Sequence, residues 1–345
     1  MGFLDYITGD HLHIGSGIEK GLGQLGNMTM SVVGFYVFSS AVIEKNMDVV
    51  RQFFQSIPFD PSILTSMLLD ITMGGYSMAK VIAASPEMAF FSGVLVASGI
   101  GCLISFQIPI IFTCIKHNDM GYIIKGITAG IITLPFGLFL GGCLCGLQVS
   151  SLLFNMIPIF LLCLLLVMGI MRAPNVLEKI LSVVGSVLRA VAHGLTVLVF
   201  LRLFFPVLEN WIPIDRTLES LNMTVRMTIG MAGGMVLIEG SIHYGRRQLH
   251  AMADWIGVNN YSLAGFIVSL VSPLAMFPIF HKMDIKGKLL NAAFSVMGAY
   301  ILGAQMSFVT QVTTASNLYI YMLTKIICGA LAMIFINVMH KRGKM

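Results

Sequence analysis

The chain consists largely of apolar stretches about as long as a helix needs to cross a lipid bilayer. A membrane-spanning helix takes about 20 apolar residues, and it satisfies its own backbone hydrogen bonds where lipid offers no partner. We expect about ten such segments. They lie near 25–43, 62–84, 88–115, 121–147, 150–171, 176–208, 218–241, 259–281, 287–312 and 317–340. The pattern predicts an all-α, polytopic integral membrane protein.

The charge content supports this environment. Only 11% of the residues are charged, whereas a soluble domain carries roughly 25%. Such a chain cannot cover itself with a polar surface. We attribute the net charge of +5 to basic residues that face anionic lipid, and we expect no nucleic-acid partner.

Two of the segments make poor continuous helices. The segment at 62–84 is interrupted by Asp70, Gly74 and Gly75. The segment at 287–312 is interrupted by Gly298, Gly303 and Gln305. We therefore expect each of them to be broken or re-entrant.

Short sequence patterns recur between the two ends of the chain. The frame S-x-x-G-F-x-V occurs at 31–37 and again at 262–268, and Met-Gly-Gly-Tyr at 73–76 has an echo in Met-Gly-Ala-Tyr at 297–300. Many secondary transporters consist of repeated units, often inverted, with the substrate bound where the units meet. We expect one membrane transport domain over 1–345, with related, inverted units at about 25–115 and 259–340 joined by helices within 121–241. The alternative is chance, because short matches are frequent in apolar sequence.

Ionisable residues within apolar segments are costly in a bilayer, and they are usually functional or paired. Asp70 is the most interior acid. One interpretation gives it a role in binding a substrate or coupling ion, and the other pairs it with Arg226 or Lys80. The simplest interpretation of Lys80, Arg202 and Lys325 is that their long side chains extend toward the membrane surface.

The residues that follow Asp70 suit a binding site. Thr72 adds a hydroxyl, Gly74 and Gly75 allow the helix to unwind and free its carbonyl groups, and Tyr76 offers a ring face that can hold an ammonium group. The alternative for the glycine pair is close packing of two helices.

We expect no enzymatic activity, no cofactor and no metal site. The sequence has no Ser/His/Asp set and no nucleotide-binding loop of the G-x-G-x-x-G or Walker type. Its six cysteines lack zinc-ligand spacing, and we interpret them as small core residues. A transport function would then use an ion gradient or facilitated diffusion.

The run Met-Asp-Ile-Lys-Gly-Lys at 283–288 is followed by Asn-Ala-Ala-Phe at 291–294. Together with Met-Gly-Gly-Tyr at 73–76, these stretches resemble the bacterial ethanolamine permeases of the EutH type, and the resemblance covers nearly the whole chain. It implies a multi-pass protein of the bacterial cytoplasmic membrane that moves ethanolamine or a similar small amino alcohol. The implied substrate-binding residues are Asp70, Thr72, Gly74, Gly75, Tyr76, Gln305 and Ser307. Asp70 and Tyr76 would hold the ammonium group, and Thr72 or Gln305 the hydroxyl.

The chain also departs from the family pattern. The family acid before M-G-G-Y aligns with Thr72, and a G-D-H-L-G-F stretch aligns with 303–308, where the acid and the histidine are replaced. The resemblance further implies that the family's N-terminal membrane helix has no counterpart here. Two alternatives therefore stay open, a transporter of the same fold for a different small metabolite and a membrane scaffold or sensor that does not transport. The expected partners are a small-molecule substrate and the lipid bilayer, and a homodimer is one assembly compatible with the sequence.

Overall fold

The computed structural model describes residues 1–39, 41, 46, 57–108, 110–111, 115–205, 208–209 and 211–341, and the regular secondary structure of these residues is helical. The predicted all-α class is confirmed. Cys114, which we assigned to the core, lies outside the described residues.

Six helices are long and apolar enough to cross a membrane within the described part of the chain. They span Pro86–Ser105, Met120–Leu144, Val149–Arg172, Pro174–Phe204, Ile214–Ser241 and Ala315–Met339. The predicted count of about ten full crossings is not confirmed. Other apolar segments form shorter helices at Pro61–Leu68, Asn260–Ser269 and Ile285–Met297. The first begins at a capping Asp60, and the last lies between a capping Asp284 and Gly298.

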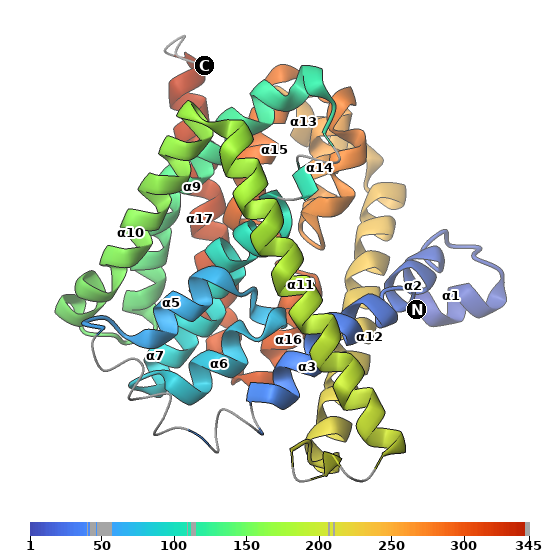
Figure 1. The fold of residues 1–345 in the computed structure, drawn as a ribbon. Coiled ribbons are helices and arrows are strands. Elements are labelled where there is room, and N and C mark those ends of the chain that lie inside the picture. The colour runs from blue at the N-terminus through green and yellow to red at the C-terminus, as the bar shows by residue number, and fades with distance from the viewer. Residues whose placement is uncertain are drawn as a thin grey trace.

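The helices form two groups, which we call the bundle and the arm (Figure 1). In the bundle, α9 (Met120–Leu144) packs against α10 (Val149–Arg172), α15 (Ile285–Met297) and α17 (Ala315–Lys341). The arm contains α2 (Ser16–Leu22), α3 (Leu25–Phe38), α11 (Pro174–Phe204) and α12 (Ile214–Tyr244), which contact one another. Beyond α12 follow α13 (Arg246–Ile256), α14 (Asn260–Ser269), and the 3-10 turns η8 (Pro273–Ala275) and η9 (Phe277–Lys282).

The bundle contains both interrupted helices that the sequence predicts. The first consists of α5 (Pro61–Leu68), the short turn η3 (Ile71–Met73) and α6 (Gly75–Ile82). The second consists of α15 and α16 (Ala304–Val312), separated by residues 298–303. A long helix follows each of them. After the first come α7 (Pro86–Phe90) and the π-helices η4 (Phe91–Gly101) and η5 (Leu103–Gln107), and after the second comes α17. The origin of the two parts from one repeated unit stays a prediction.

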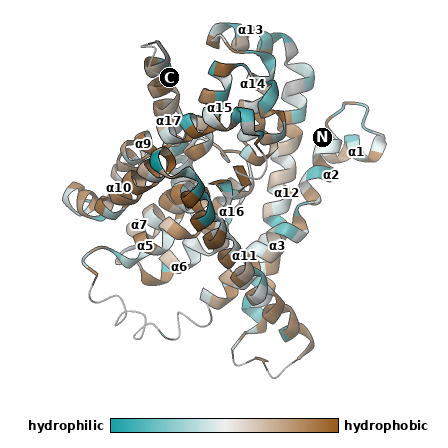
Figure 2. Cartoon of the chain, turned by 45° about the horizontal axis from the view of Figure 1, so that its top comes forward, coloured by the Kyte–Doolittle hydropathy of each residue, from teal (hydrophilic) through white to brown (hydrophobic). Residues whose placement is uncertain are grey.

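The long helices differ in how much lipid they can face. In the most apolar 18-residue stretch of Pro86–Ser105, 100% of the residues are buried inside the protein, whereas in that of α11 only 22% are buried. Apolar side chains such as Leu153, Phe160 and Leu164 are exposed on α10. Figure 2 shows that α10 is mostly apolar, whereas apolar residues alternate with hydrophilic ones along α11. Exposed apolar surface of this extent is stable only against lipid, so α10 and α11 lie at the outside of the protein. The fully buried η4 lies at the centre of the bundle.

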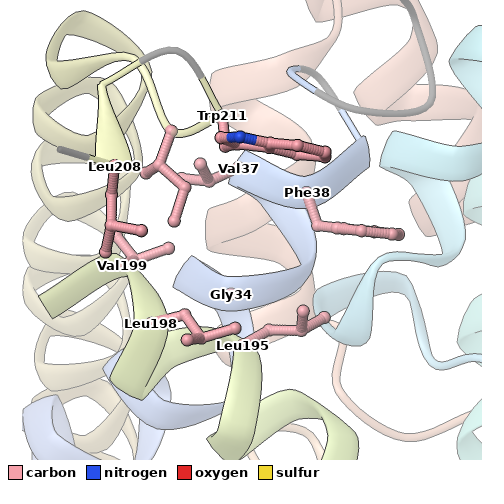
Figure 3. Close-up of a pocket in the computed structure, with 9 residues that line it drawn as sticks. Gly34, Val37, Phe38, Leu195, Leu198, Val199, Leu208 and Trp211 are labelled. Carbon is pink, nitrogen blue, oxygen red and sulfur yellow. The ribbon is translucent and has the colours of Figure 1, made fainter. Parts of the chain in front are cut away.

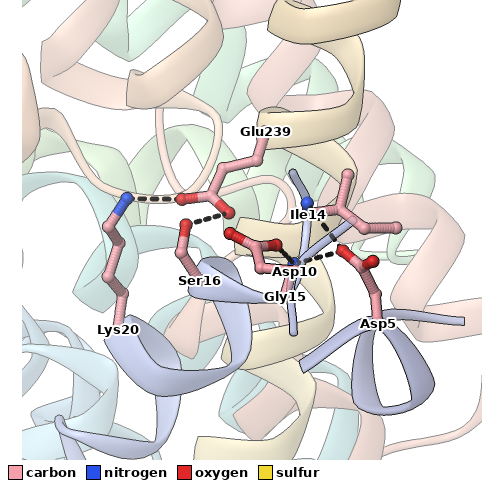
Figure 4. Close-up of polar contacts among 7 residues, drawn as sticks. All are labelled: Asp5, Asp10, Ile14, Gly15, Ser16, Lys20 and Glu239. Atoms are coloured by element: carbon pink, nitrogen blue, oxygen red, sulfur yellow. Dashed lines mark hydrogen bonds and ion pairs between the residues drawn. The ribbon is translucent and has the colours of Figure 1, made fainter. Parts of the chain in front are cut away.

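The N-terminal residues are tied to α12 by polar contacts (Figure 4). Burial opposes ionisation of Asp5, but its carboxylate accepts hydrogen bonds from the backbone N–H groups of Leu12, Ile14 and Gly15, which hold the pKa below its usual value. Glu239 of α12 accepts from Ser16 Oγ at 2.8 Å and pairs with Lys20 Nζ at 2.5 Å. These contacts place the start of α3 beside α12, next to the cavity described below.

Candidate functional site

A cavity of about 360 Å³ lies where the bundle meets the arm, at the interruptions of both broken helices. The arm contributes Gln24 and Met28 from one side, and Met231 and Met235 from α12. The bundle contributes five polar residues, which are Asp70, Thr72, Cys102, Tyr300 and Gln305, and Ser272 comes from the cap of η8. The remaining lining residues are Val271, Leu274, Ala275 and Ala304. Two halves of the chain that are far apart in sequence thus build one polar wall.

Asp70 is the centre of this wall. It lies just beyond the end of α5, where its Oδ1 accepts hydrogen bonds from the Thr72 backbone N–H at 2.8 Å and the Thr72 hydroxyl at 2.5 Å. Its Oδ2 accepts from Gln305 Nε2 at 2.9 Å. Because Gln305 belongs to the first turn of α16, this bond joins the two interruptions directly.

Asp70 forms no direct ion pair in the part of the chain that the structure describes, although the buried Lys325 lies near enough for the two charges to interact at longer range. Asp70 is only 2% exposed. The ion pairs among the described residues join other partners, which are Lys20 to Glu239, Arg202 to Glu209, Arg216 to Glu219 and Lys288 to Asp119. Lys80 and Arg226 are both exposed. The interpretation that pairs Asp70 with one of them is therefore wrong, because their side chains lie at the surface of the protein, whereas Asp70 is buried.

Four of the seven candidate residues do not line this cavity. Gly74 adopts φ +92°, and a Cβ placed on it would lie 2.9 Å from Phe35 Cβ. A Cβ on Gly75 would lie 2.8 Å from that of Ala97. The glycine pair thus serves both the turn in the chain and the close packing that we considered as an alternative.

Tyr76 and Ser307 also point elsewhere. The Tyr76 hydroxyl donates to the carbonyl oxygen of Val312 at 3.1 Å, and its ring packs edge-to-face on Phe308 with centroids 6.1 Å apart. Ser307 faces Gly230 of α12, where an added Cβ would lie 2.2 Å from its Oγ. Both residues join α16 to its neighbours.

Sequence reasoning missed four polar residues of the cavity, which are Gln24, Cys102, Ser272 and Tyr300. Tyr300 has φ +64°, which is uncommon for a residue with a side chain. The echo between 73–76 and 297–300 could have pointed to it, because Tyr300 ends the second copy. Cys102 was assigned to the core, and it is indeed buried, but it also borders the cavity.

Lys325 contradicts its sequence interpretation. Instead of extending to the membrane surface, its side chain is completely buried, and its Nζ donates to the carbonyl oxygens of Met297 at 3.2 Å and Ser98 at 3.4 Å. Arg202 is also buried, although it pairs with the exposed Glu209 near the end of α11. Only Lys80 is exposed as expected. Distance from the end of a segment does not reveal which face of a helix meets protein.

The motif at 283–288 lies outside the cavity and fastens helices together. Asp284 caps α15 and accepts from the backbone N–H of Asn259 at 2.9 Å. Lys286 donates to the carbonyl oxygen of Ile256. Lys288 forms a buried ion pair with Asp119 at 2.6 Å. This motif therefore positions α15 against α9 and α14.

A second cavity, of about 300 Å³, lies in the arm between α3, α11 and the residues Leu208, Trp211 and Ile212 (Figure 3). Its walls are formed by Gly34, Val37, Phe38, Leu195, Leu198, Val199, Leu208, Trp211 and Ile212. Among the described residues that line it, none offers a carboxylate, amide or hydroxyl side chain to a polar ligand. The two cavities are similar in size, so the chemistry of their walls identifies the first one as the candidate site.

Comparison with known proteins gives a consistent result. A family model described as "Ethanolamine utilisation protein, EutH" matches residues 1–339. A "Probable ethanolamine permease EutH" of Listeria monocytogenes is 27% identical over 310 residues, which cover 89% of this chain and 82% of the relative. Proteins of the same name from Salmonella typhimurium and Escherichia coli are 25% and 24% identical over 317 residues, covering 85% of this chain and 78% of each relative. No solved structure matches the chain.

Proposed function

Because this chain belongs to the family of the ethanolamine utilisation protein EutH, we propose that it is a permease that carries ethanolamine, or a similar small amino alcohol, across the membrane. The chain is a multi-pass protein of the bacterial inner membrane, as its membrane-length helices and its bacterial relatives indicate. The relatives named as permeases favour transport over an enzymatic reaction.

The observation that carries the proposal is the buried Asp70 carboxylate in the wall of a polar cavity. A buried carboxylate loses its hydration, and its hydrogen bonds to Thr72 and Gln305 replace only part of it. At neutral pH ethanolamine is mostly a cation, so its ammonium group can provide an opposite charge in direct contact with the carboxylate. A charge-assisted hydrogen bond of this kind is short and roughly twice as strong as a neutral one.

The neighbouring groups suit the alcohol end of the substrate. Gln305 Oε1 and the Ser272 hydroxyl line the same cavity and can bond to a hydroxyl group. The methionines of the arm close the opposite side and offer no competing charge. One carboxylate and a few neutral polar groups thus match one ammonium and one hydroxyl.

The position of the cavity suits alternating access. Transporters with interrupted helices bind their substrate at the interruptions, and one group of helices rocks against the other around the site. Here the substrate would lie between the bundle and the arm, and movement between them would open the site to either side. The driving force would be a gradient or the concentration difference of the substrate itself.

One feature favours a second candidate, a larger amino alcohol. Met28, Met231 and Met235 give the arm side of the cavity a flexible, apolar surface. Such a surface accommodates additional methyl groups on the nitrogen or the carbon chain. Competition of unlabelled methylated amino alcohols with labelled ethanolamine would rank these substrates.

The direct test is uptake of radiolabelled ethanolamine into cells that express this chain, at acidic and alkaline pH. We expect uptake at acidic pH, where the substrate is a cation, and its loss in Asp70→Asn. Asp254→Asn is the matched control, because it makes the same chemical change at an exposed position of α13.

Two results would contradict the proposal. Uptake no higher than in cells with an empty vector, with the protein present in the membrane, would favour another substrate or a scaffold or sensor without transport. Uptake that follows only the neutral fraction of ethanolamine, and is unchanged in Asp70→Asn, would remove the role of the carboxylate.

A further inference from the structure

Lys325 is a buried cation that forms no direct ion pair among the residues described by the structure, and Asp70 acts on its charge only at longer range. It lies within the membrane-spanning helix α17, and its side chain is completely buried. Its hydrogen-bond acceptors are two backbone carbonyl oxygens, and its ammonium group lies 5.3 Å from the ring centroid of Tyr321 and 5.9 Å from that of Tyr300. Ionisable groups in such positions are costly and usually functional.

The two carbonyl groups that accept from Lys325 belong to two different helices of the bundle, α15 and η4. Met297 is the last residue of α15, so its carbonyl lacks the usual partner within the helix and lies at the negative end of the helix dipole. Ser98 belongs to η4, the buried helix at the centre of the bundle. The ammonium group therefore joins the interruption of the second broken helix to the central helix.

This position lies directly behind the candidate site. Tyr300, whose ring faces the ammonium group, lines the cavity. The Tyr321 hydroxyl lies 3.0 Å from the carbonyl oxygen of Tyr300 and 3.4 Å from Gln305 Oε1. Gln305 in turn donates to Asp70. Lys325 thus supports the wall that contains the substrate-binding groups.

In transporters with interrupted helices, the carbonyl ends of half-helices and unwound backbone are the groups that coordinate a coupling sodium ion. We propose that the Lys325 ammonium is a tethered substitute for such a cation, a positioning residue that holds the end of α15 against η4 and makes transport independent of sodium. Because the charge is covalently attached, it cannot leave with the substrate. This inference deepens the proposed permease function and rests on it.

The first experiment measures the thermal stability of the purified protein in sodium, methylammonium and choline chloride at equal ionic strength. We expect the Tm of the wild type to be the same in all three. We expect Lys325→Ala to have a lower Tm that sodium or methylammonium raises and the larger choline does not. Lys80→Ala removes an exposed lysine instead and should respond to none of them.

The second experiment measures ethanolamine uptake into proteoliposomes in the same salts. The wild type should work equally well in sodium and in choline. Lys325→Ala should lose uptake in choline and regain part of it with sodium or methylammonium, and Lys325→Arg should retain part of it in choline. An ordinary core lysine would show no such rescue.

Three results would overturn the inference. They are a sodium requirement of the wild type, wild-type behaviour of Lys325→Ala in every salt, and loss of stability or uptake that neither cation restores. If the variants do not reach the membrane, ion substitution on the wild type still decides, since a sodium requirement refutes the proposal and sodium independence supports it. Failure of the wild type to transport ethanolamine would refute the proposed function instead, and the stability measurements would still test the role of Lys325.

Discussion

The two interrupted helices have similar backbone layouts but different chemistry. Each begins with an aspartate cap, since Asp60 accepts from the Ser62 N–H and Asp284 from the Gly287 N–H. Each then breaks near a residue with positive φ, which is Gly74 in the first and Tyr300 in the second. The first break, however, presents a carboxylate to the cavity, whereas the second presents an amide, with a lysine behind it.

This difference separates two roles of the breaks, which are to shape the backbone around the cavity and to supply the side chains that bind the substrate. The breaks bring polar groups together in the middle of an apolar protein, and such breaks require only turn residues and caps. The side chains at the breaks then determine what can bind. If the layout and the chemistry are separable, substitutions at the caps and turns should affect stability, and substitutions at Asp70 and Gln305 should affect the substrate.

The largest effect is expected when the carboxylate of Asp70 is removed from the first break and a carboxylate is then placed at Gln305 in the second. A hydrogen bond to a charged group contributes about 1.5–3 kcal/mol, so Asp70→Asn should lower uptake at low substrate concentration by roughly one to two orders of magnitude. The double variant Asp70→Asn/Gln305→Asp returns a carboxylate to the opposite side of the same contact, and we expect it to regain part of the uptake. Initial rates against ethanolamine concentration measure both.

A double variant no better than Asp70→Asn alone would show that the acid is required in the first break specifically. In that case the two breaks would differ in geometry as well as in chemistry.

A smaller effect, on stability, is expected at the turn of the first break. A left-handed conformation costs a non-glycine residue about 1–2 kcal/mol, and Gly74→Ala adds the contact with Phe35 at 2.9 Å. The free energy of unfolding should therefore fall more in Gly74→Ala than in Gly146→Ala, because Gly146 has φ +82° but no atom within 4 Å of an added Cβ. Unfolding of the purified variants gives both values.

Equal losses at the two glycines would mean that Phe35 moves aside at little cost. The packing of α3 on the first break would then be less specific than the contact indicates.

The two aspartate caps should contribute about equally. Loss of a helix cap costs about 0.5–2 kcal/mol, and both caps have further donors, Ala84 N–H for Asp60 and Asn259 N–H for Asp284. Asp60→Ala and Asp284→Ala should thus lower the free energy of unfolding by similar amounts. Asp60→Asn and Asp284→Asn keep an accepting oxygen, and they should lose less.

A loss confined to one of the two alanine variants would break the comparison at the level of layout. It would show that the bundle depends on one broken helix more than on the other.

The smallest effects distinguish the two tyrosines of the echoed pattern. Tyr76→Phe removes a hydrogen bond to the backbone of Val312, worth about 0.5–1.5 kcal/mol, and it should leave the KM for uptake unchanged. Tyr300→Phe keeps the ring next to Lys325 but removes a hydroxyl from the cavity lining, so the KM should change modestly. The opposite pattern would place the substrate near Tyr76 and away from the cavity described here.

Sequence patterns predicted the breaks well because turn residues act locally. Glycine at 74 and 298 and the polar residues at 70 and 305 interrupt apolar segments wherever those segments lie, and both segments are indeed broken. Asp70, Thr72 and Gln305 also line one cavity. Tyr76 was placed there by proximity in sequence, but α6 turns its ring toward Phe308.

The sequence by itself determined that the protein lies in a lipid bilayer, that it is helical and where two of its helices are interrupted. Long apolar segments with few charges must form helices in lipid, because no other structure satisfies the backbone there, and the resemblance at 283–294 identified the family. Only the tertiary structure decided which side chains meet. The direction of a side chain depends on how its helix is rotated against its neighbours, and that rotation is set by packing between segments far apart in the chain. For this reason the contact of Asp70 with Gln305 and the complete burial of Lys325 became visible only in the folded protein.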